Sequence, residues 1–286
     1  MGERTFFGHR QSGPTFRFKE GFDLLRYFWF PRDLVRNGLW AAWPTAAKSV
    51  FPVILHFMDE KGTCFPGLDT IGILCGRDRK TVAEGVDFLL SQHIPLERST
   101  RTTAAGRKAY TYRWPVVTRQ RGLFFPFRHC VFDGGNWAML TPTAQALYVT
   151  MRTFGLISGD GEIDIVFSED LSGDAPDYGK RDFEFCRADL DVLCELSGIR
   201  SRRTLNAALD SLCVNWLAAR DAGMDYEDGA ETWRVFLTPP RYFKRDYLNA
   251  AIDKKFPLSK KLSKKLSKRL AKGFTETRFQ QGSNFP

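Results

Sequence analysis

The sequence lacks the residue patterns on which most enzyme chemistry depends. It has four histidines, His9, His56, His93 and His129, and none stands in sequence next to a residue with which it would form a catalytic pair. It contains no P-loop, no G-x-S-x-G and no H-E-x-x-H. These absences argue against a nucleotide hydrolase, a serine hydrolase and a zinc peptidase. We therefore predict that the chain is not an enzyme.

Cysteine pairs and long apolar runs are also missing. The six cysteines include no C-x-x-C pair, and the one conceivable zinc group, His129, Cys130 and Cys186, does not have the spacing of a zinc motif. No run of about 18 apolar residues could form a membrane span. Residues 1–7 lack the apolar core of a signal peptide. We expect a reduced, cytoplasmic protein that binds no metal and no cofactor.

What the chain does have is positive charge, concentrated near its C-terminal end. The formal net charge is +9, yet residues 240–286 hold 13 Lys or Arg against 3 Asp or Glu, and the remainder holds 29 against 30. From Leu258 a Leu-Ser-Lys-Lys block recurs every four residues, which predicts an amphipathic basic helix. We expect it to bind the DNA backbone, with an unstructured tail, an anionic membrane surface and a protein partner as alternatives. The cations expected at phosphates are Lys260, Lys261, Lys264, Lys265, Lys268 and Arg269.

Two segments in the body of the chain share one pattern. Residues 68–76 and 190–198 both begin with Leu-Asp, carry apolar residues at the same offsets and end in Gly. Each runs into a basic segment with a helix-capping residue, Asp78 in the first copy and Ser201 in the second. A short apolar helix, a Gly turn and a basic capped helix are the parts of a helix-turn-helix. The duplication therefore predicts two DNA-binding modules.

The repeat extends on both sides of this core. Residues 40–46 match residues 137–144, and residues 86–89 match residues 209–212. The second copy carries an insertion at 155–185 with nine acidic and two basic residues, which is a poor candidate for contact with phosphate.

Hydrophobic spacing and turn residues place the expected elements of each copy. In the first copy we predict a helix over 44–58 that Pro52 kinks or ends early. A β-hairpin should follow the third helix and form a wing. The predicted helices are 44–58, 68–75 and 79–90 in the first copy and 142–154, 190–196 and 202–212 in the second; the predicted strands are 94–97, 109–114, 163–167, 216–220 and 233–237.

The predicted fold is α+β and mostly helical, with two consecutive winged helix-turn-helix domains, β-hairpin wings and a basic C-terminal helix or tail. We divide the chain into an N-terminal arm (1–27), a first domain (28–118), a second domain (119–240) and the tail (241–286).

In the first copy, the third helix and the hairpin are both basic. A recognition helix places its first residues against base edges in the major groove, where Arg pairs with guanine, whereas Lys80 and Thr81 are better suited to phosphate. A hairpin flanked by Arg suits a minor groove or the phosphate backbone. The expected DNA contacts of this copy are Arg77, Arg79, Lys80, Thr81, Arg98, Arg101, Arg107 and Lys108.

The second copy has a basic helix start beside an acidic hairpin loop at 221–231. Phosphate repels such a loop, so either the helix binds DNA without the hairpin or the module serves another role such as dimerisation. Asn206 is placed to read adenine. The expected contacts are Arg200, Ser201, Arg202, Arg203 and Asn206.

Both copies resemble the winged-helix domains of plasmid and phage replication proteins. In the first copy the segment Gly-Thr-Cys-Phe-Pro-Gly before the second helix is similar to a Gly-x-Cys-Phe-Pro-Ser pattern of that family, with Gly67 where Ser is usual. The resemblance is carried by residues 30–34, 62–71, 79–82 and 106–112, and it covers 28–114 closely and 125–238 more distantly.

Tandem winged helices are also similar to the architecture of theta-type plasmid replication initiators. This resemblance implies modules that bind adjacent major grooves of a repeated origin sequence, one of which often mediates dimerisation. It implies double-stranded DNA as the partner, with a second copy of the chain and host replication proteins as further candidates. We expect sequence-specific DNA binding in plasmid or mobile-element replication; the alternatives are a transcriptional regulator with the same modules and a protein-interaction scaffold.

Overall fold

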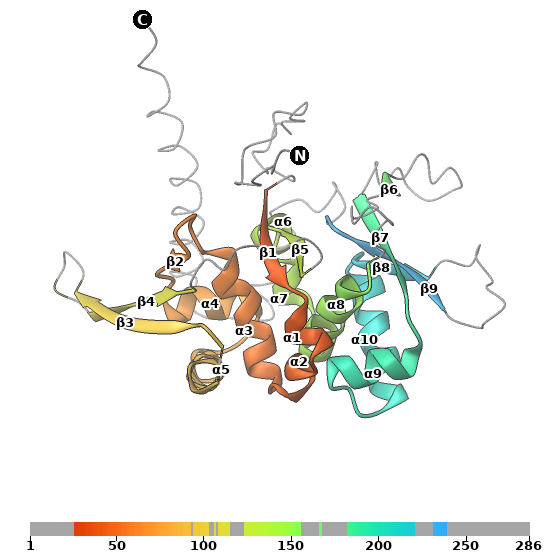
Figure 1. Ribbon diagram of the computed structural model, residues 1–286, viewed down its shortest axis with the longest axis horizontal. Coiled ribbons are helices and arrows are strands. Elements are labelled where there is room, and N and C mark those ends of the chain that lie inside the picture. The colour runs from red at the N-terminus through yellow and green to blue at the C-terminus, as the bar shows by residue number, and fades with distance from the viewer. Residues whose placement is uncertain are drawn as a thin grey trace, which may run out of the picture.

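Helices and small antiparallel sheets alternate along the chain, and the fold is α+β (Figure 1). The computed structural model describes residues 26–92, 94–102, 106, 108–114, 123–155, 166–167, 182–220 and 231–238. Most of the predicted N-terminal arm, the tip of the first hairpin, most of the acidic insertion, the second hairpin loop and the whole basic tail lie outside these residues. No helix in the described part of the chain is long and apolar enough to span a bilayer.

The described residues of the first half form three small helices, two longer ones and four strands. In order these are β1 (Tyr27–Pro31), α1 (Asp33–Arg36), α2 (Leu39–Ala42), α3 (Thr45–His56), β2 (Thr63–Cys64), α4 (Leu68–Cys75), α5 (Arg79–Ser91), β3 (Glu97–Thr102) and β4 (Lys108–Arg113).

The second half repeats this order and adds strands. Its elements are β5 (Phe124–Arg128), α6 (Cys130–Asp133), α7 (Asn136–Met139), α8 (Pro142–Thr153), β6 (Val166–Phe167), β7 (Asp182–Arg187), α9 (Leu190–Ser197), α10 (Arg202–Val214), β8 (Ala218–Arg220) and β9 (Thr232–Phe236).

The strands of the described residues form three small sheets, and each is antiparallel. β1 pairs with β5 and so joins the two halves of the chain. The second sheet has the order β2-β4-β3, and the third has the order β6-β7-β9-β8. In both of the larger sheets a hairpin follows the basic helix of its half, β3–β4 after α5 and β8–β9 after α10.

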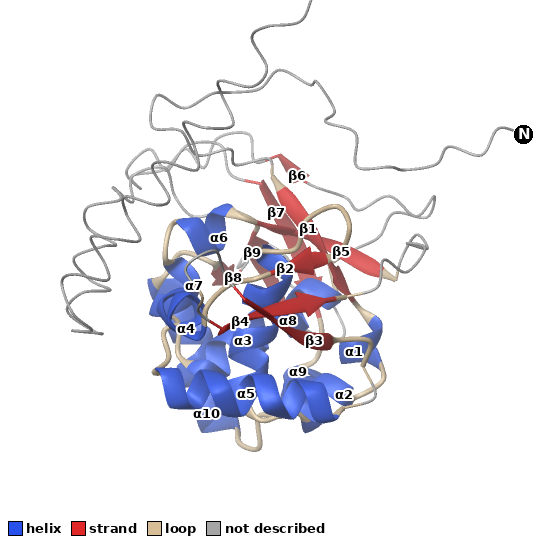
Figure 2. Cartoon of the chain, turned by 90° about the vertical axis from the view of Figure 1, so that its left-hand side faces the viewer, coloured by secondary structure: helices blue, strands red, loops and turns tan. Residues whose placement is uncertain are grey.

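One continuous apolar core runs through both halves. Its centre is aromatic: Phe28 stacks on Phe127 with ring centroids 5.3 Å apart, and Phe30 stacks on Phe125 at 5.2 Å. These pairs lie across the β1–β5 ladder, and α3 and α8 pack against them and against each other. Figure 2 shows β1 and β5 in the upper half of the molecule and α5, α9, α10 and α2 along its lower edge.

The predicted helices of both copies are confirmed, with ends that differ by at most a few residues. Of the two effects predicted for Pro52, a kink or an early end, the early end is wrong, because α3 continues past Pro52 to His56. A proline inside a helix removes one N–H donor and costs about 3 kcal/mol. Here Phe51, Val53 and Ile54 are fully buried, and their packing offsets that cost.

The first hairpin forms, but its first strand lies later than predicted. The strand is Glu97–Thr102 rather than 94–97, because Leu96 packs into the core just before the strand begins. All six residues of β3 are exposed, so the strand has no apolar alternation by which the sequence could reveal it.

Candidate nucleic-acid interface

The basic start of α5 is fixed by a helix cap. Asp78 accepts a hydrogen bond from the backbone N–H of Thr81 at 2.9 Å, and a second from the Thr81 hydroxyl at 2.7 Å. These bonds hold the pKa of Asp78 below its usual value. The cap uses the one hydroxyl hydrogen of Thr81, so this hydroxyl cannot also donate to a phosphate. A phosphate at the start of α5 would be bound by the neighbouring cations.

The turn before α5 is pressed against the second half of the chain. Gly76 ends α4 with a left-handed φ of +70°, and a methyl group at this position would collide with the carbonyl oxygen of Ala138 in α7. Gln145 of α8 donates to the last carbonyl of α4, that of Cys75, at 3.0 Å. The second half of the chain therefore sets the direction in which α5 leaves the turn.

Arg77 belongs to this contact between the halves. Its Nη2 lies 3.0 Å from Oε1 of Gln145, and its Nη1 donates to the carbonyl of Gly76 at 2.9 Å. Partial burial lowers the pKa of the guanidinium. Arg77 was predicted from sequence as a DNA contact; the structure places it half-buried at the base of α5, where it positions the helix.

The next two cations of α5 face solvent. Arg79 pairs with Asp69 at 3.0 Å while two-thirds of its side chain stays exposed. Lys80 is 87% exposed, 4.0 Å from Glu84. Exposed ion pairs contribute only about 0–1 kcal/mol, so both cations are available to a ligand. Val82, Val86 and Leu89 are fully buried, as predicted.

The β3–β4 hairpin presents arginines stacked on aromatic rings. Arg98 lies over Tyr110 at 4.8 Å and pairs with Asp87 of α5 at 2.8 Å. Arg101 lies over Phe65 at 4.3 Å, and Phe65 is 58% exposed. Stacking restricts these long side chains, which lowers the entropy lost when they bind a partner. Arg107 and the side chain of Lys108 lie outside the described residues.

The turn of the second half has the same construction with different side chains. Gly198 ends α9 with a φ of +74°, and a methyl group there would collide with the carbonyl oxygen of Ala41 in α2. Lys48 of α3 donates to the carbonyl of Ser197 at 2.9 Å and to that of Ala41 at 3.0 Å. Burial lowers the pKa of the Lys48 ammonium to about 8.

The predicted contacts of α10 lie at its first turn. Ser201 caps the helix by accepting from the backbone N–H of Thr204 at 3.2 Å. Arg202 pairs with Asp191 at 2.8 Å and has 47% of its side chain exposed. Arg203 and Asn206 are exposed, with no partner among the described residues.

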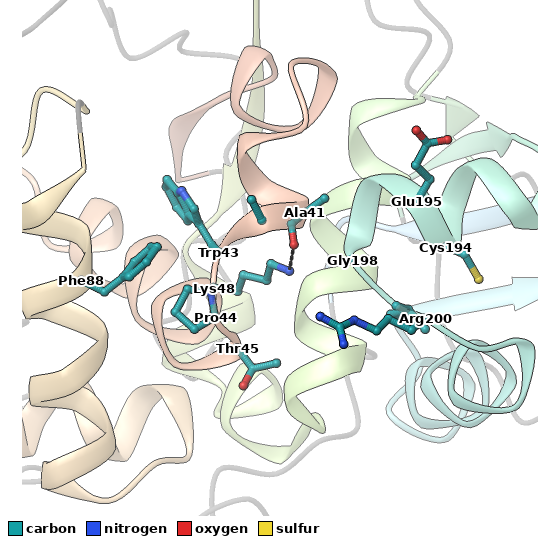
Figure 3. Close-up of a pocket in the computed structure, with 12 residues that line it drawn as sticks. Ala41, Trp43, Pro44, Thr45, Lys48, Phe88, Cys194, Glu195, Gly198 and Arg200 are labelled. Atoms are coloured by element: carbon teal, nitrogen blue, oxygen red, sulfur yellow. Dashed lines mark hydrogen bonds between the residues drawn. The ribbon is translucent and has the colours of Figure 1, made fainter.

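A groove of about 730 Å³ separates α5 from the turn between α9 and α10. Figure 3 shows Phe88 of α5 on one side and Arg200 on the other, with the guanidinium of Arg200 directed into the groove. Lys48 lies at its base, bonded to Ala41. The groove thus lies between the C-terminal part of α5 and the turn that leads into α10, and the basic first turn of α5 does not line it. The tail cations Lys260 to Arg269 lie outside the described residues.

Sequence reasoning did not find the residues that join the halves. Lys48 and Gln145 are buried polar residues in predicted helices, and nothing local distinguishes them. The signal that could have found them is the repeat itself, since they occupy equivalent positions of α3 and α8.

A buried histidine pair was also missed. Nδ1 of His129 lies 2.8 Å from Nδ1 of His56, and Nε2 of His56 lies 3.3 Å from Oδ1 of Asp133. Phe28 and Phe132 pack around these rings, which gives the cluster the surroundings of a core. Among the described residues no group of three His, Cys, Asp or Glu side chains could hold a metal ion.

Comparison of the chain with protein-family models, with curated proteins and with solved structures finds no match.

Proposed function

We propose that the chain is a sequence-specific double-stranded DNA-binding protein built from two winged helix-turn-helix modules. α4 and α5 with the β3–β4 hairpin form the first module, and α9 and α10 with the β8–β9 hairpin form the second. The observation that carries the proposal is that α5 and α10 each begin with a capped, basic first turn, which follows a short helix and a glycine turn.

The two modules contribute unequally. In the first, Arg79 and Lys80 of the helix and Arg98 and Arg101 of the hairpin supply exposed positive charge. An α-helix fits the major groove, while a basic hairpin suits the flanking phosphates. In the second module the helix supplies Arg203 and Asn206, and the loop of its hairpin is acidic in sequence. We assign base contacts to both helices and hairpin contacts to the first module.

The basic tail adds sequence-independent affinity in this proposal. Its cations would neutralise phosphates whatever the base sequence, and the counterions that they release make binding dependent on salt. Neutralising Lys260, Lys261, Lys264, Lys265, Lys268 and Arg269 together should weaken binding to all duplexes equally.

The biological role that we propose is initiation of plasmid or mobile-element replication at repeated origin sequences. The sequence resemblance of 28–114 to replication-protein modules supports it. A transcriptional regulator would use the same modules. Footprints separate the two, since an initiator protects repeats at an origin and a regulator protects an operator at a promoter.

The direct test is removal of one cation from each helix start. The variant Arg79→Ala with Arg203→Ala should lose specific duplex binding, because each good contact from Arg to a base contributes about 1–3 kcal/mol of discrimination. The matched control, Arg26→Ala with Lys61→Ala, removes the same charge from exposed positions outside both helices and should bind nearly as the wild type does. Unchanged binding of the first variant would favour the scaffold alternative.

A further inference from the structure

The two halves of the chain are related by an internal twofold axis. Every element boundary from Tyr27 to His56 recurs 97 positions later, from Phe124 to Thr153. In the β1–β5 ladder the central pair is Trp29 with Pro126, which are equivalent positions. An antiparallel pair of equivalent strands, centred on equivalent residues, is the arrangement that a twofold axis produces.

The same axis relates hydrogen bonds in the core. Trp40 donates its indole N–H to the carbonyl of Ala146 at 3.2 Å, and Trp137 donates to the carbonyl of Ser49 at 3.0 Å. Trp137 is the equivalent of Trp40, and Ala146 is the equivalent of Ser49. The halves therefore exchange identical contacts, as the two subunits of a symmetric dimer do.

The helix turns follow the axis too. Gly76 abuts the carbonyl of Ala138, and Gly198 abuts that of Ala41, which is the equivalent residue. Gln145 bonds the last carbonyl of α4, whereas Lys48, its equivalent, bonds the last carbonyl of α9. Each half thus holds the turn of the other.

The axis extends to the helix starts. Arg79 pairs with Asp69, and the equivalent Arg202 pairs with the equivalent Asp191. The buried residues of the two helices also correspond, Val82, Gly85, Val86 and Leu89 in α5 with Leu205, Ala208, Leu209 and Leu212 in α10. Figure 1 places α5 and α10 on opposite sides of α3 and α8, and Figure 2 places both along the lower edge.

From this symmetry we infer that a single copy of the chain binds two half-sites of opposite orientation, so that its DNA target is an imperfect inverted repeat. The inference rests on the proposed function. Duplex DNA has local twofold axes perpendicular to its length, and each axis exchanges the two strands. Two helices related by such an axis therefore contact half-sites that run outward from it in opposite directions. The half-sites should lie about one helical turn apart, roughly 34 Å.

The half-sites differ in sequence because the outward residues of the helices differ. Lys80, Ala83 and Glu84 of α5 occupy the positions of Arg203, Asn206 and Ala207 in α10. The axis therefore sets the orientation of the half-sites, and these three positions set the difference between them.

This arrangement makes the inference testable by exchanging side chains. The full chain with Lys80→Arg, Ala83→Asn and Glu84→Ala presents the α10 residues at both helix starts. The reciprocal variant, Arg203→Lys with Asn206→Ala and Ala207→Glu, presents the α5 residues twice and serves as the matched control. Bound duplexes are selected from a random pool with the wild type and with each variant.

The wild type should select two different half-sites, and each variant should select a perfect inverted repeat, with a different sequence for each variant. Inserting five base pairs, about half a helical turn, between the two half-sites should weaken binding at least about tenfold, because the contacts of one half-site are lost. A direct repeat or a single half-site from the variants would overturn the inference and leave DNA binding intact. Failure of the wild type to enrich any duplex would overturn the proposed function itself.

Discussion

Arg152 of α8 and Glu184 of β7 form an ion pair that is fully buried. Nε of Arg152 lies 2.7 Å from Oε2 of Glu184, and both side chains are at most 1% exposed. Nη2 of Arg152 also donates to the carbonyl of Pro126 in β5. The pair therefore ties α8 to β7, a strand that begins in the last residues of the acidic insertion, and to the ladder at the centre of the molecule.

Replacing Glu184 by Gln should destabilise the fold strongly. The substitution leaves the guanidinium of Arg152 buried without a counter-charge, which costs about 3–5 kcal/mol. The nearby Arg32 adds to this cost, because burial already lowers its pKa to about 10 and Glu184 acts against that shift. Urea unfolding followed by circular dichroism measures the loss.

The control for this prediction removes both charges. Arg152→Met with Glu184→Leu removes both members of the pair, so only Arg32 is left without the carboxylate, and the variant should cost less than Glu184→Gln alone. Equal destabilisation by the two variants would show that packing, and not charge, is what the pair contributes.

The turn glycines provide a second prediction. Gly76→Ala and Gly198→Ala should each destabilise the fold, by about 1–3 kcal/mol for the collision with the opposite carbonyl and about 1–2 kcal/mol more for the left-handed backbone. The two losses should be similar, since the positions are equivalent. Denaturant titration of each variant gives the values.

Gly38 is the matched control, because its φ is +72° and no atom lies near the added methyl group. Gly38→Ala should lower the free energy of unfolding only by the cost of placing alanine in the left-handed conformation, about 1–2 kcal/mol. If Gly76→Ala cost no more than Gly38→Ala, the close contact between α4 and α7 would not exist in solution.

The buried histidine pair predicts a loss of stability in acid. Burial, and then the neighbouring His56, lower the pKa of His129 to about 3, against about 6.5 in an unfolded chain. Between these values the unfolded chain binds a proton that the folded chain does not. The free energy of unfolding should therefore fall as the pH drops below about 6.5, with a slope that approaches about 1.4 kcal/mol per pH unit.

The measurement is the free energy of unfolding as a function of pH, for the wild type and for His129→Gln. Between about pH 6.5 and 4 the free energy should fall less steeply in the variant, because the unfolded variant lacks the imidazole that takes up this proton. Asp133 contributes in the same direction at lower pH. Burial is the largest single influence and acts to raise its pKa, but the hydrogen bond to His56 and the charges of His56, His129 and Arg26 together lower it. Identical slopes for the wild type and the variant would contradict the assignment to His129.

Local signals in the sequence were enough to predict the helices. The predicted Asp78 and Ser201 caps both form, and the apolar spacing of α5 and α10 matches their buried faces. The β1–β5 ladder was not predicted, because strands that pair across 97 positions leave no local pattern, and because Phe-rich segments with a proline do not alternate. This long-range pairing is stabilised by the packing of aromatic side chains from both strands in the core.

The candidate site likewise contains residues that the sequence could predict and residues that it could not. The cations of the helix starts could be listed from the sequence, since caps and turns place them on exposed first turns. The role of Arg77 could not, because its partner Gln145 is 68 positions away. The twofold axis was likewise hidden, although the repeat that produces it was visible from the first matching segment.

The central claim, that two basic helix starts bind duplex DNA, is tested most directly by the affinity of the full chain for a selected duplex between about 50 and 200 mM salt. If the helix starts bind duplex DNA, the logarithm of the association constant should fall linearly with the logarithm of salt concentration. The slope should be shallower for Lys80→Ala with Arg203→Ala than for the wild type, and unchanged for Arg26→Ala with Lys61→Ala. Affinity that does not depend on salt, or slopes that do not respond to the helix variant, would contradict this claim.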